Sequence, residues 1–234
     1  MESRLAFLSP PSPCEYLPDR EWQLHYDVVR HATPADYADR LDRGWRRFGH
    51  VLFRPECPSC QSCWSLRVRV DAFTPSRSQR RAWNVNQRDV ALHIASPSAS
   101  LAKIKLFDRY HEYQQVAKHW PATAAHGLER FTDNPFPTEE WCYYAGERLI
   151  AVGYVDALPT GLSAIYFYYD PQERQRSLGT YNVLAIIAAA RERHLPYVYL
   201  GYYVEGCPSL EYKARFRPNE VLRPDGAWRS FSHT

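Results

Sequence analysis

The segment GLSAIYFYYDPQERQRSLGTYNVLAIIAAARERHLPYVYLGYYV, residues 161–204, decides the fold class of this chain. Its first ten residues end at Asp170-Pro171 and predict a strand rich in aromatic and β-branched side chains. Residues 177–194 repeat apolar side chains at helical spacing, and residues 196–204 predict a second strand. A strand, a helix and a strand in this order predict a right-handed crossover between two parallel strands.

The residues before this segment predict an antiparallel meander beside the crossover. WCYYAGERLIAVGYVDAL, residues 141–158, predicts a hairpin around Ala145-Gly146-Glu147. Residues 101–119 predict a helix, and the turn-rich SPSAS at 96–100 predicts a domain boundary. This order of elements is similar to the core of acetyltransferase-like (GNAT) folds. We therefore expect an α+β protein with a GNAT-like mixed-sheet domain at residues 96–234.

A coenzyme A enzyme of this fold would hold pyrophosphate on a loop of the type [RQ]-x-x-G-x-[GA] at the start of a helix. The nearest match is RSLGTY, residues 176–181, where Tyr181 replaces the small residue that close backbone approach requires. We expect no coenzyme A or nucleotide cofactor. A small-molecule acetyltransferase nevertheless stays open as an alternative.

Residues 1–95 are expected to form a second, smaller domain. Thr33, Pro34 and Gly44 predict a helix over about 34–43. Residues 64–73 alternate apolar and charged side chains, which predicts a half-buried strand with a charged outer face. SRSQRRAWNVNQRD, which begins at Ser76, predicts a further helix or helical turn capped by Ser76 or Ser78.

This N-terminal region contains the cysteine motif PECPSCQSCW, residues 55–64. Cys57, Cys60 and Cys63 are spaced so that a tight turn brings their thiols to one metal ion, and most closed structural sites need four ligands. Cys14, also in a proline-bordered loop, is the preferred fourth ligand, with His25 or His50 as substitutes. The set suits Zn²⁺ or an iron–sulfur cluster. The alternative is a group of partly buried free cysteines. Cys142 and Cys207 lie in the other part of the chain and are expected to be core or site-lining residues, not metal ligands.

Positive charge is concentrated near this motif. The net charge of the chain is +3, but residues 43–88 contain ten arginines, no lysine, and only Glu56 and Asp71 as acids. Arginine is suited to forked contacts with phosphate, so the cluster favours a nucleic-acid partner over a merely solvated basic face. The longest apolar runs are too short for a membrane span or a signal peptide. We therefore expect a cytoplasmic protein with reduced thiols.

Three groups of motifs show a resemblance to a known family. Cys14-x-Tyr16-Leu17-Pro18, GWRRFGHVLFRPECPSCQSC and PSRSQRR lie in the first half of the chain, and YFYYDP, SLGTYNVL and YLGYYVEGCPSLEYKARFRP in the second. Over about residues 12–228 the chain resembles the aminoacyl-tRNA–protein transferases, which include bacterial aspartate/glutamate leucyltransferases and eukaryotic arginyltransferases. The resemblance implies that the four N-terminal cysteines form the metal or cluster site.

The resemblance also implies an amino acid moving from charged tRNA to the α-amine of an acceptor protein that begins with Asp or Glu. The catalytic candidates are Asp170, Tyr168 and Lys213, although Asp170 also suits a helix-entry position. The candidate contacts to tRNA or acceptor are Arg77, Gln79, Arg80, Arg81, Tyr166, Tyr169, Gly179, Tyr181, Arg215 and Arg217. Among them the arginines of PSRSQRR suit phosphates, the tyrosines suit stacking on the terminal adenine, and Lys213, Arg215 and Arg217 suit an acidic acceptor.

These residues leave open which aminoacyl-tRNA is the donor and to which functional class the protein belongs. PSRSQRR and the chain length resemble the leucyl branch, so leucyl-tRNA is the expected donor, and the product would enter N-degron proteolysis. GCPSLEYKARFRP is similar to the arginyl branch, although Ser209-Leu210 replaces its usual Lys-Met. Lys118-His119 and the following WPATAAHG also depart from the family pattern. The alternative from a non-enzymatic class is a thiol–metal module that binds RNA or senses redox state. We expect a monomer.

Overall fold

The large sheet has eight strands and forms most of the protein. A computed structural model describes residues 1–118 and 127–231, although the side chain of Lys118 is not described. The strand order is β14-β13-β7-β12-β11-β10-β9-β8, and every neighbouring pair is antiparallel except β11 and β12. The bounds are β7 Trp64–Arg69, β8 Val90–Ala95, β9 Thr138–Ala145, β10 Arg148–Leu158, β11 Gly161–Tyr169, β12 Tyr197–Tyr203, β13 Asn219–Leu222 and β14 Trp228–Phe231.

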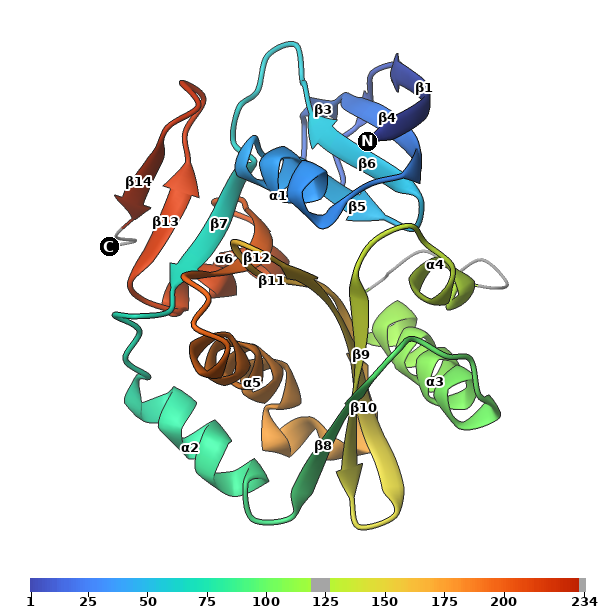
Figure 1. The fold of residues 1–234 in the computed structure, drawn as a ribbon, viewed down its shortest axis with the longest axis vertical. Coiled ribbons are helices and arrows are strands. Elements are labelled where there is room, and N and C mark those ends of the chain that lie inside the picture. Colours follow the sequence, from blue (N-terminus) through green and yellow to red (C-terminus); the bar gives the residue numbers. More distant parts are fainter. Residues whose placement is uncertain (119–126, 232–234) are drawn as a thin grey trace.

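Helices cover both faces of this sheet (Figure 1). α5 (Leu178–Glu192) and α2 (Arg77–Asn86) pack on one face, and α3 (Leu101–Lys118) packs on the other, near α4 (Glu129–Thr132). Short helical turns complete the chain: η1 (Pro171–Arg176), α6 (Pro208–Glu211) and η2 (Tyr212–Arg215). None of the helices described has the length and apolar character that crossing a membrane requires.

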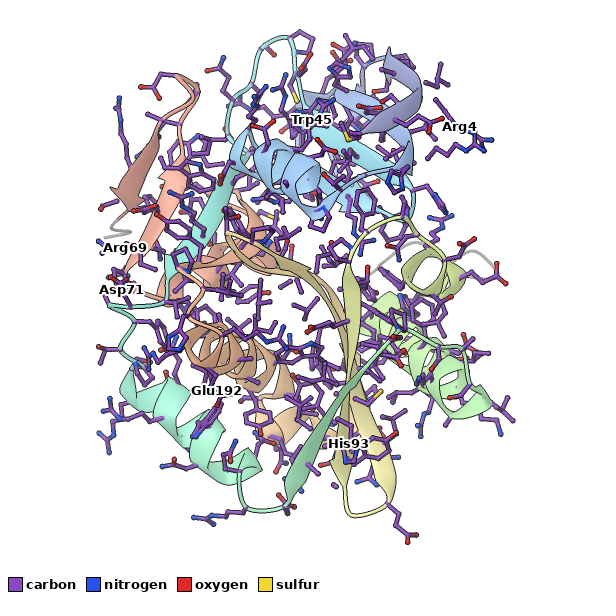
Figure 2. The ribbon with its side chains drawn as sticks, in the orientation of Figure 1. Arg4, Trp45, Arg69, Asp71, His93 and Glu192 are labelled. Carbon is purple, nitrogen blue, oxygen red and sulfur yellow. The ribbon has the colours of Figure 1, made fainter. Side chains whose placement is uncertain are left out.

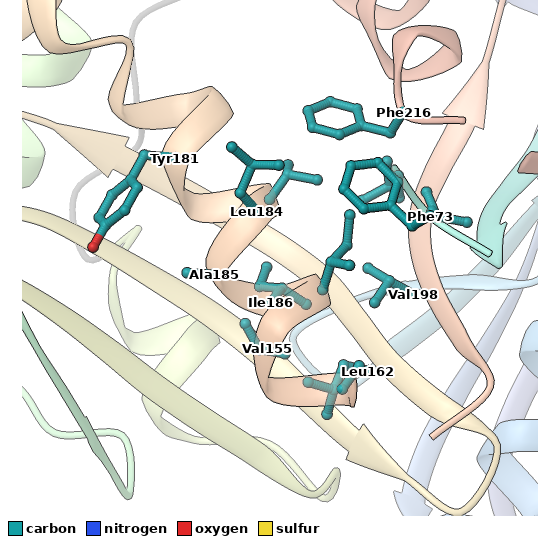
Figure 3. Packing of buried hydrophobic residues seen from close by; sticks show 14 of the residues in the cluster. Phe73, Val155, Leu162, Tyr181, Leu184, Ala185, Ile186, Val198 and Phe216 are labelled. Atoms are coloured by element: carbon teal, nitrogen blue, oxygen red, sulfur yellow. The ribbon is translucent and has the colours of Figure 1, made fainter. Parts of the chain in front are cut away.

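The main core lies between α5 and the sheet. Figure 3 shows Leu184 and Ile186 of α5 among Val155, Leu162 and Val198 of three strands. β10 is buried along nearly its whole length because helices cover both faces of the sheet, which explains its nearly continuous apolar sequence. The predicted hairpin, crossover helix and flanking strands are all confirmed. The predicted helix over 101–119 is confirmed to residue 118, and its last residue and WPATAAH, residues 120–126, lie outside the described residues.

A smaller sheet stands above the large one in Figure 1. Its order is β1-β4-β6-β5, formed by β1 (Glu2–Leu8), β4 (Leu24–His31), β6 (Val51–Pro55) and β5 (Arg46–Phe48), and a short ribbon of β2 (Ser12–Pro13) and β3 (Glu21–Trp22) precedes β4. α1 (Pro34–Asp42) packs against one face through Tyr37 and Leu41. The predicted cap of α1 is confirmed, since the Thr33 side chain accepts from Asp36 N at 3.1 Å. In Figure 2, Trp45 lies beside α1.

The predicted boundary at residue 95 does not follow the sheets. β7 and β8 come from the expected N-terminal domain, yet both are strands of the large sheet, and α2 between them packs on α5. The expected charged outer face of β7 is also absent at its centre. Arg67 is buried, with Nε 2.8 Å from Glu220 and Nη1 3.1 Å from Asp42. Alternation of apolar and charged residues resembles a half-exposed strand even where each charge has an internal partner. Arg69 and Asp71 do lie at the outer edge of the molecule (Figure 2).

A buried ion pair joins the two sheets. Arg47 of β5 donates from Nε to Asp156 Oδ2 at 2.6 Å and from Nη2 to Asp156 Oδ1 at 2.5 Å, and both side chains are fully buried. Arg47 Nη2 and Asp156 Oδ1 also bond to Thr138 Oγ1, at 2.7 and 2.9 Å. Because β5 belongs to the small sheet and β10 to the large one, this forked pair fixes their relative position.

We expect Arg47→Met to lower the free energy of unfolding by about 3–5 kcal/mol, because it leaves Asp156 charged and buried without its partner. Urea unfolding followed by circular dichroism measures this loss. The double variant Arg47→Met/Asp156→Leu should recover part of it, since neither charge is then buried. A single variant as stable as wild type would contradict this role of the pair.

Candidate functional site

β11 and β12 pair over only three positions, Gly161–Ser163 with Tyr197–Tyr199. β11 then continues beside β10, and β12 continues beside β7. The two parallel strands therefore separate towards their carboxyl ends. In open sheets with helical crossovers, ligands bind outside the carboxyl ends of such strands.

Lys213 lies under the far end of β12. Its Nζ donates to Tyr202 O at 2.7 Å, and a Cβ at Gly201, which has φ +81°, would lie 3.5 Å from Nζ. Burial and the nearby Arg46 together lower the pKa of Lys213 to about 7, with Cys207 acting in the opposite direction. Lys213 is therefore not a surface cation grouped with Arg215 and Arg217, as the sequence suggested, since those two side chains are exposed.

The exposed arginines gather where α2 begins. Arg77, Arg80 and Arg81 are exposed on the first turns of α2, after a capping box in which Ser76 Oγ accepts from Gln79 N at 3.3 Å. Gln79 itself is buried, and its Nε2 donates to Arg215 O at 3.1 Å. Gln79 thus holds Arg215 beside the arginines of α2 instead of contacting a ligand. These exposed arginines, with Arg217 two residues further along, are called the arginine face below.

Other arginines of the predicted basic cluster are internal or paired. Arg46, Arg47 and Arg67 are buried, and Arg54 bonds to Glu56. The charge count of residues 43–88 therefore overstated the positive surface, because these side chains brace the fold. Sequence reasoning did not single out Arg46. The sequence shows only two adjacent arginines in GWRR, and their burial is known from the structure.

The tyrosines expected to stack on adenine pack under α3 and α4 instead. Tyr168 is 0% exposed, and the Tyr166 ring stacks on Phe131 at 4.8 Å between centroids. Tyr166 OH donates to His111 Nε2 at 2.7 Å, while His111 Nδ1 donates to Phe107 O at 2.8 Å. Tyr166 and Tyr168 share one face of β11, and Leu106, Phe107 and Tyr110 of α3 cover that face.

Tyr169 is half-buried, and its ring lies 5.2 Å from that of Tyr110. The three tyrosines of β11 that the sequence singled out, Tyr166, Tyr168 and Tyr169, therefore belong to the packing between β11 and α3. Sequence reasoning could not see this, because the covering side chains come from a helix that lies about fifty residues earlier in the chain.

Asp170 has the helix-entry role that the sequence left open. It is 2% exposed, accepts from Gln172 N at 3.1 Å at the start of η1, and lies 3.2 Å from Arg148 and 3.6 Å from Arg109. These contacts occupy the carboxylate. A general-base role for Asp170 stays a prediction that this geometry does not favour.

Two predicted binding residues lie near the start of α5: the backbone at Gly179 has open space beside it, whereas the Tyr181 side chain is buried. Gly179 has space where a side chain would extend, with no atom within 4 Å of a Cβ built there. Tyr181 is buried, stacks obliquely on Trp83 at 5.5 Å and accepts from Gln87 Nε2 at 3.2 Å. Tyr181 therefore fills the contact between α5 and α2, which explains why a large residue replaces Gly or Ala there.

The cysteine loops lie together at a cavity. Cys57, Cys60 and Cys63 line a hollow of about 410 Å³ together with Tyr202. Burial, together with the neighbouring Cys57 and Cys14, raises the pKa of Cys63 to about 12, which places Cys14 in the same neighbourhood. A four-thiol donor set of this kind suits Zn²⁺ or an iron–sulfur cluster.

The thiols are not arranged as ligands, however. Among residues 1–118 and 127–231, no three His, Cys, Asp or Glu side chains are placed as a metal site, so the expected metal-binding domain is not confirmed. Cys57 Sγ donates to Gln23 O at 3.8 Å, and Cys60 Sγ to Ser62 Oγ at 3.4 Å. The alternative ligands are engaged elsewhere: His25 lies 3.2 Å from Glu56, and His50 lies 3.8 Å from Asp133.

Comparison with known proteins identifies the family. Residues 12–81 match the N-terminal and residues 102–223 the C-terminal region of the arginine-tRNA–protein transferases. The chain belongs to the arginine-tRNA–protein transferase family. It is 36% identical to the aspartate/glutamate leucyltransferase of Helicobacter hepaticus, over 93% of this chain and 91% of that protein. It is also 36% identical to the aspartate/glutamate leucyltransferase of Nitrosococcus oceani, over 97% and 96%. The expected resemblance is thus confirmed.

A solved structure supports the fold alone. The C-terminal domain of a protein described as a lysylphosphatidylglycerol synthetase, from Agrobacterium fabrum, superposes with a TM-score of 0.51 at 11% identity. The match covers 82% of this chain and 62% of that structure. The predicted acyltransferase-like mixed sheet is in agreement with this likeness.

Lys213 should make stability depend on pH. Its pKa is about 7 in the folded protein and near the ordinary lysine value of 10.5 in the unfolded chain, so between these values the unfolded chain binds a proton that the folded protein does not. The free energy of unfolding should therefore rise from pH 7 to pH 9 by about 2 kcal/mol more in wild type than in Lys213→Met. Urea unfolding of both proteins at both pH values measures the difference. Equal pH slopes would show that Lys213 keeps its proton.

Proposed function

We propose that this enzyme transfers leucine from leucyl-tRNA to the N-terminal amine of proteins that begin with Asp or Glu. The observation that carries the proposal is the near full-length similarity to aspartate/glutamate leucyltransferases, together with the arginine face. Arginyl-tRNA is the alternative donor, since the matched family is named for arginine.

The reaction needs no nucleophilic side chain of the enzyme, because the acceptor amine is itself the nucleophile. The acceptor amine attacks the ester carbonyl of the aminoacyl-tRNA, an amide bond forms, and the ester bond to the ribose oxygen breaks. That oxygen leaves with the proton that the amine loses. An α-amine has an ordinary pKa of about 7.7–8.0, so a useful fraction is neutral near physiological pH. Positioning of the two substrates therefore supplies most of the rate enhancement.

The arginine face is suited to hold the tRNA. Arg77, Arg80 and Arg81 project from the start of α2, where the backbone amides of the first helical turn add positive potential. Gln79 fixes Arg215 beside them through its backbone carbonyl. In this proposal the acceptor stem lies along α2 and its 3′ end reaches Gly179, where α5 begins and the backbone is accessible.

The cysteines are proposed to hold a metal. Cys14, Cys57, Cys60 and Cys63 would bind Zn²⁺ or an iron–sulfur cluster, because their loops adjoin and their thiols influence one another. When bound, such a centre supplies folding energy by pinning the Cys14 loop to the loop before β7. The transfer chemistry would still rest on the positions of the substrates. We place the reaction in the cytoplasm, with a monomeric enzyme and an N-degron product.

A transfer assay tests the proposal. Purified protein, leucyl- or arginyl-tRNA and peptides that begin with Asp, Glu or Ala are combined, and the peptide mass is read. We expect one leucine on Asp and Glu peptides and none on Ala peptides. Arginine addition would move the enzyme to the other branch. No addition by folded, metal-loaded protein would remove the proposal and favour a thiol–metal RNA-binding module.

Arg80→Ala and Arg81→Ala should each weaken tRNA binding and lower the slope of log K against log salt by about 1, the effect of losing one phosphate contact. Filter binding across salt concentrations measures both quantities. Arg30→Ala is the matched control, because Arg30 is exposed on β4 of the small sheet. Equal effects of all three substitutions would contradict a specific arginine face.

Cys57→Ser and Cys63→Ser should each lower the metal content of purified protein from about one site per chain to near zero, since a closed site needs four ligands. Elemental analysis and optical absorption distinguish zinc from iron–sulfur. Cys142→Ser is the control, because Cys142 lies in the core beside α3. Full metal content in the Cys57 and Cys63 variants would exclude this site.

A further inference from the structure

Arg46 is a buried cation with unused hydrogen-bond donors. It is 6% exposed, and its Nη1 donates to Trp45 O at 2.7 Å. Its Nε and Nη2 have no hydrogen-bond partner within the described part of the chain. An unpaired buried guanidinium is costly, because the charge loses water and gains no compensating contact.

Lys213 lies beside it and shares the same neighbour. The Arg46 guanidinium carbon is 5.6 Å from the centroid of the Tyr202 ring, and Lys213 Nζ is bonded to Tyr202 O. Lys213 is 8% exposed, so solvent screens neither cation. Two basic side chains from segments more than 160 residues apart thus both contact Tyr202, near the end of β12.

The other buried lysine and arginine side chains of the described residues all have a carboxylate partner. Arg47 pairs with Asp156, Arg67 with Glu220 and Lys103 with Glu140. Buried Asp27 and Asp170 are likewise occupied, by Arg40 and Arg148 respectively.

Arg46 and Lys213 have no ion pair of this kind within residues 1–118 and 127–231. Asp42 contributes to the potential at Arg46, but it is bonded to Arg67 and to Tyr199 OH at 2.7 Å. Among the described residues, each of the other buried arginines and lysines has a carboxylate partner from the chain itself. Arg46 and Lys213 are therefore suited to an anion that comes from a ligand.

We propose that Arg46 and Lys213 bind the side-chain carboxylate of the acidic N-terminal residue of the acceptor. This inference rests on the proposed function and assigns a specificity-determining role to Arg46. The two cations are buried, which suits one small anion, whereas the phosphates of tRNA meet the exposed arginine face. The bound carboxylate offsets one positive charge of the pair and accepts from the free Nε and Nη2 of Arg46.

Tyr202 lies between the pair and the cavity, since it lines the cavity and contacts both Arg46 and Lys213. The Tyr202 ring lines the cavity of about 410 Å³, and its hydroxyl donates to Gly44 O at 2.8 Å. The Arg46 guanidinium packs against this ring, and neither Arg46 nor Lys213 is among the residues that line the cavity. In the proposal, a side chain of the length of Asp or Glu enters from the cavity and passes the Tyr202 ring to reach the guanidinium. The cysteines line the same cavity, so a metal–thiolate centre is the competing anion, and the test has to separate the two.

Calorimetry with dipeptides tests the site without tRNA. Wild type should bind Asp-Ala at least tenfold more tightly than the isosteric Asn-Ala. Arg46→Gln should reduce that ratio to near one, Arg46→Lys should keep part of it, and metal content should stay unchanged. Arg43→Gln is the matched control, because Arg43 lines the cavity but is exposed and paired with Asp39. Retained preference in Arg46→Gln, or loss of metal instead of preference, would overturn the inference.

A second measurement needs no variant. The charged groups that face Lys213 are Arg46 and Cys207, and a bound carboxylate restores its proton. Binding of Asp-Ala at pH 8 should therefore take up a proton that Asn-Ala binding does not, measured in buffers of different ionisation enthalpy. No difference between the peptides would also overturn the inference. Selective Asp-Ala binding without leucine transfer would instead keep the site and reject the proposed function.

Discussion

The forked ion pair between Arg47 and Asp156 is the constraint on which the rest of the structure depends. It is the buried contact that fixes the small sheet on the large one, and the cavity with the cysteines lies where the two sheets meet. Arg46 directly precedes Arg47 on β5, so the same ion pair also fixes its position. Arg47 therefore has an internal carboxylate partner, while its neighbour Arg46 has unused donors for the proposed acceptor site.

The proposed substrates approach different parts of one framework. Lys213 contacts the end of β12, the arginine face begins at α2, and Gln79 links α2 to the segment that contains both Lys213 and Arg215. The donor and acceptor contacts are thus held by one short stretch of chain, residues 213–217. A shift of that stretch would change both contacts together, which suits a reaction that relies on positioning.

The sequence predicted the crossover, the hairpin, the helix caps and the family, because these depend on local patterns and specific motifs. It did not predict the small sheet, the boundary or the burial of key side chains. Alternation along β7 is a local property, whereas its internal partners Asp42 and Glu220 are distant in sequence. The burial of Tyr168 and Lys213 likewise depends on α3 and β12, which no spacing within their own segments reveals.

The position of β7 also has a consequence for how the protein is made. β7 comes from the first third of the chain, yet its partners on both sides, β12 and β13, come from the last fifth. A ribosome therefore releases β7 long before either partner exists, and its edges stay unpaired until synthesis is nearly finished. Pairings this distant along the chain are slow to form and expose strand edges meanwhile. The large sheet closes only when almost the whole polypeptide has emerged.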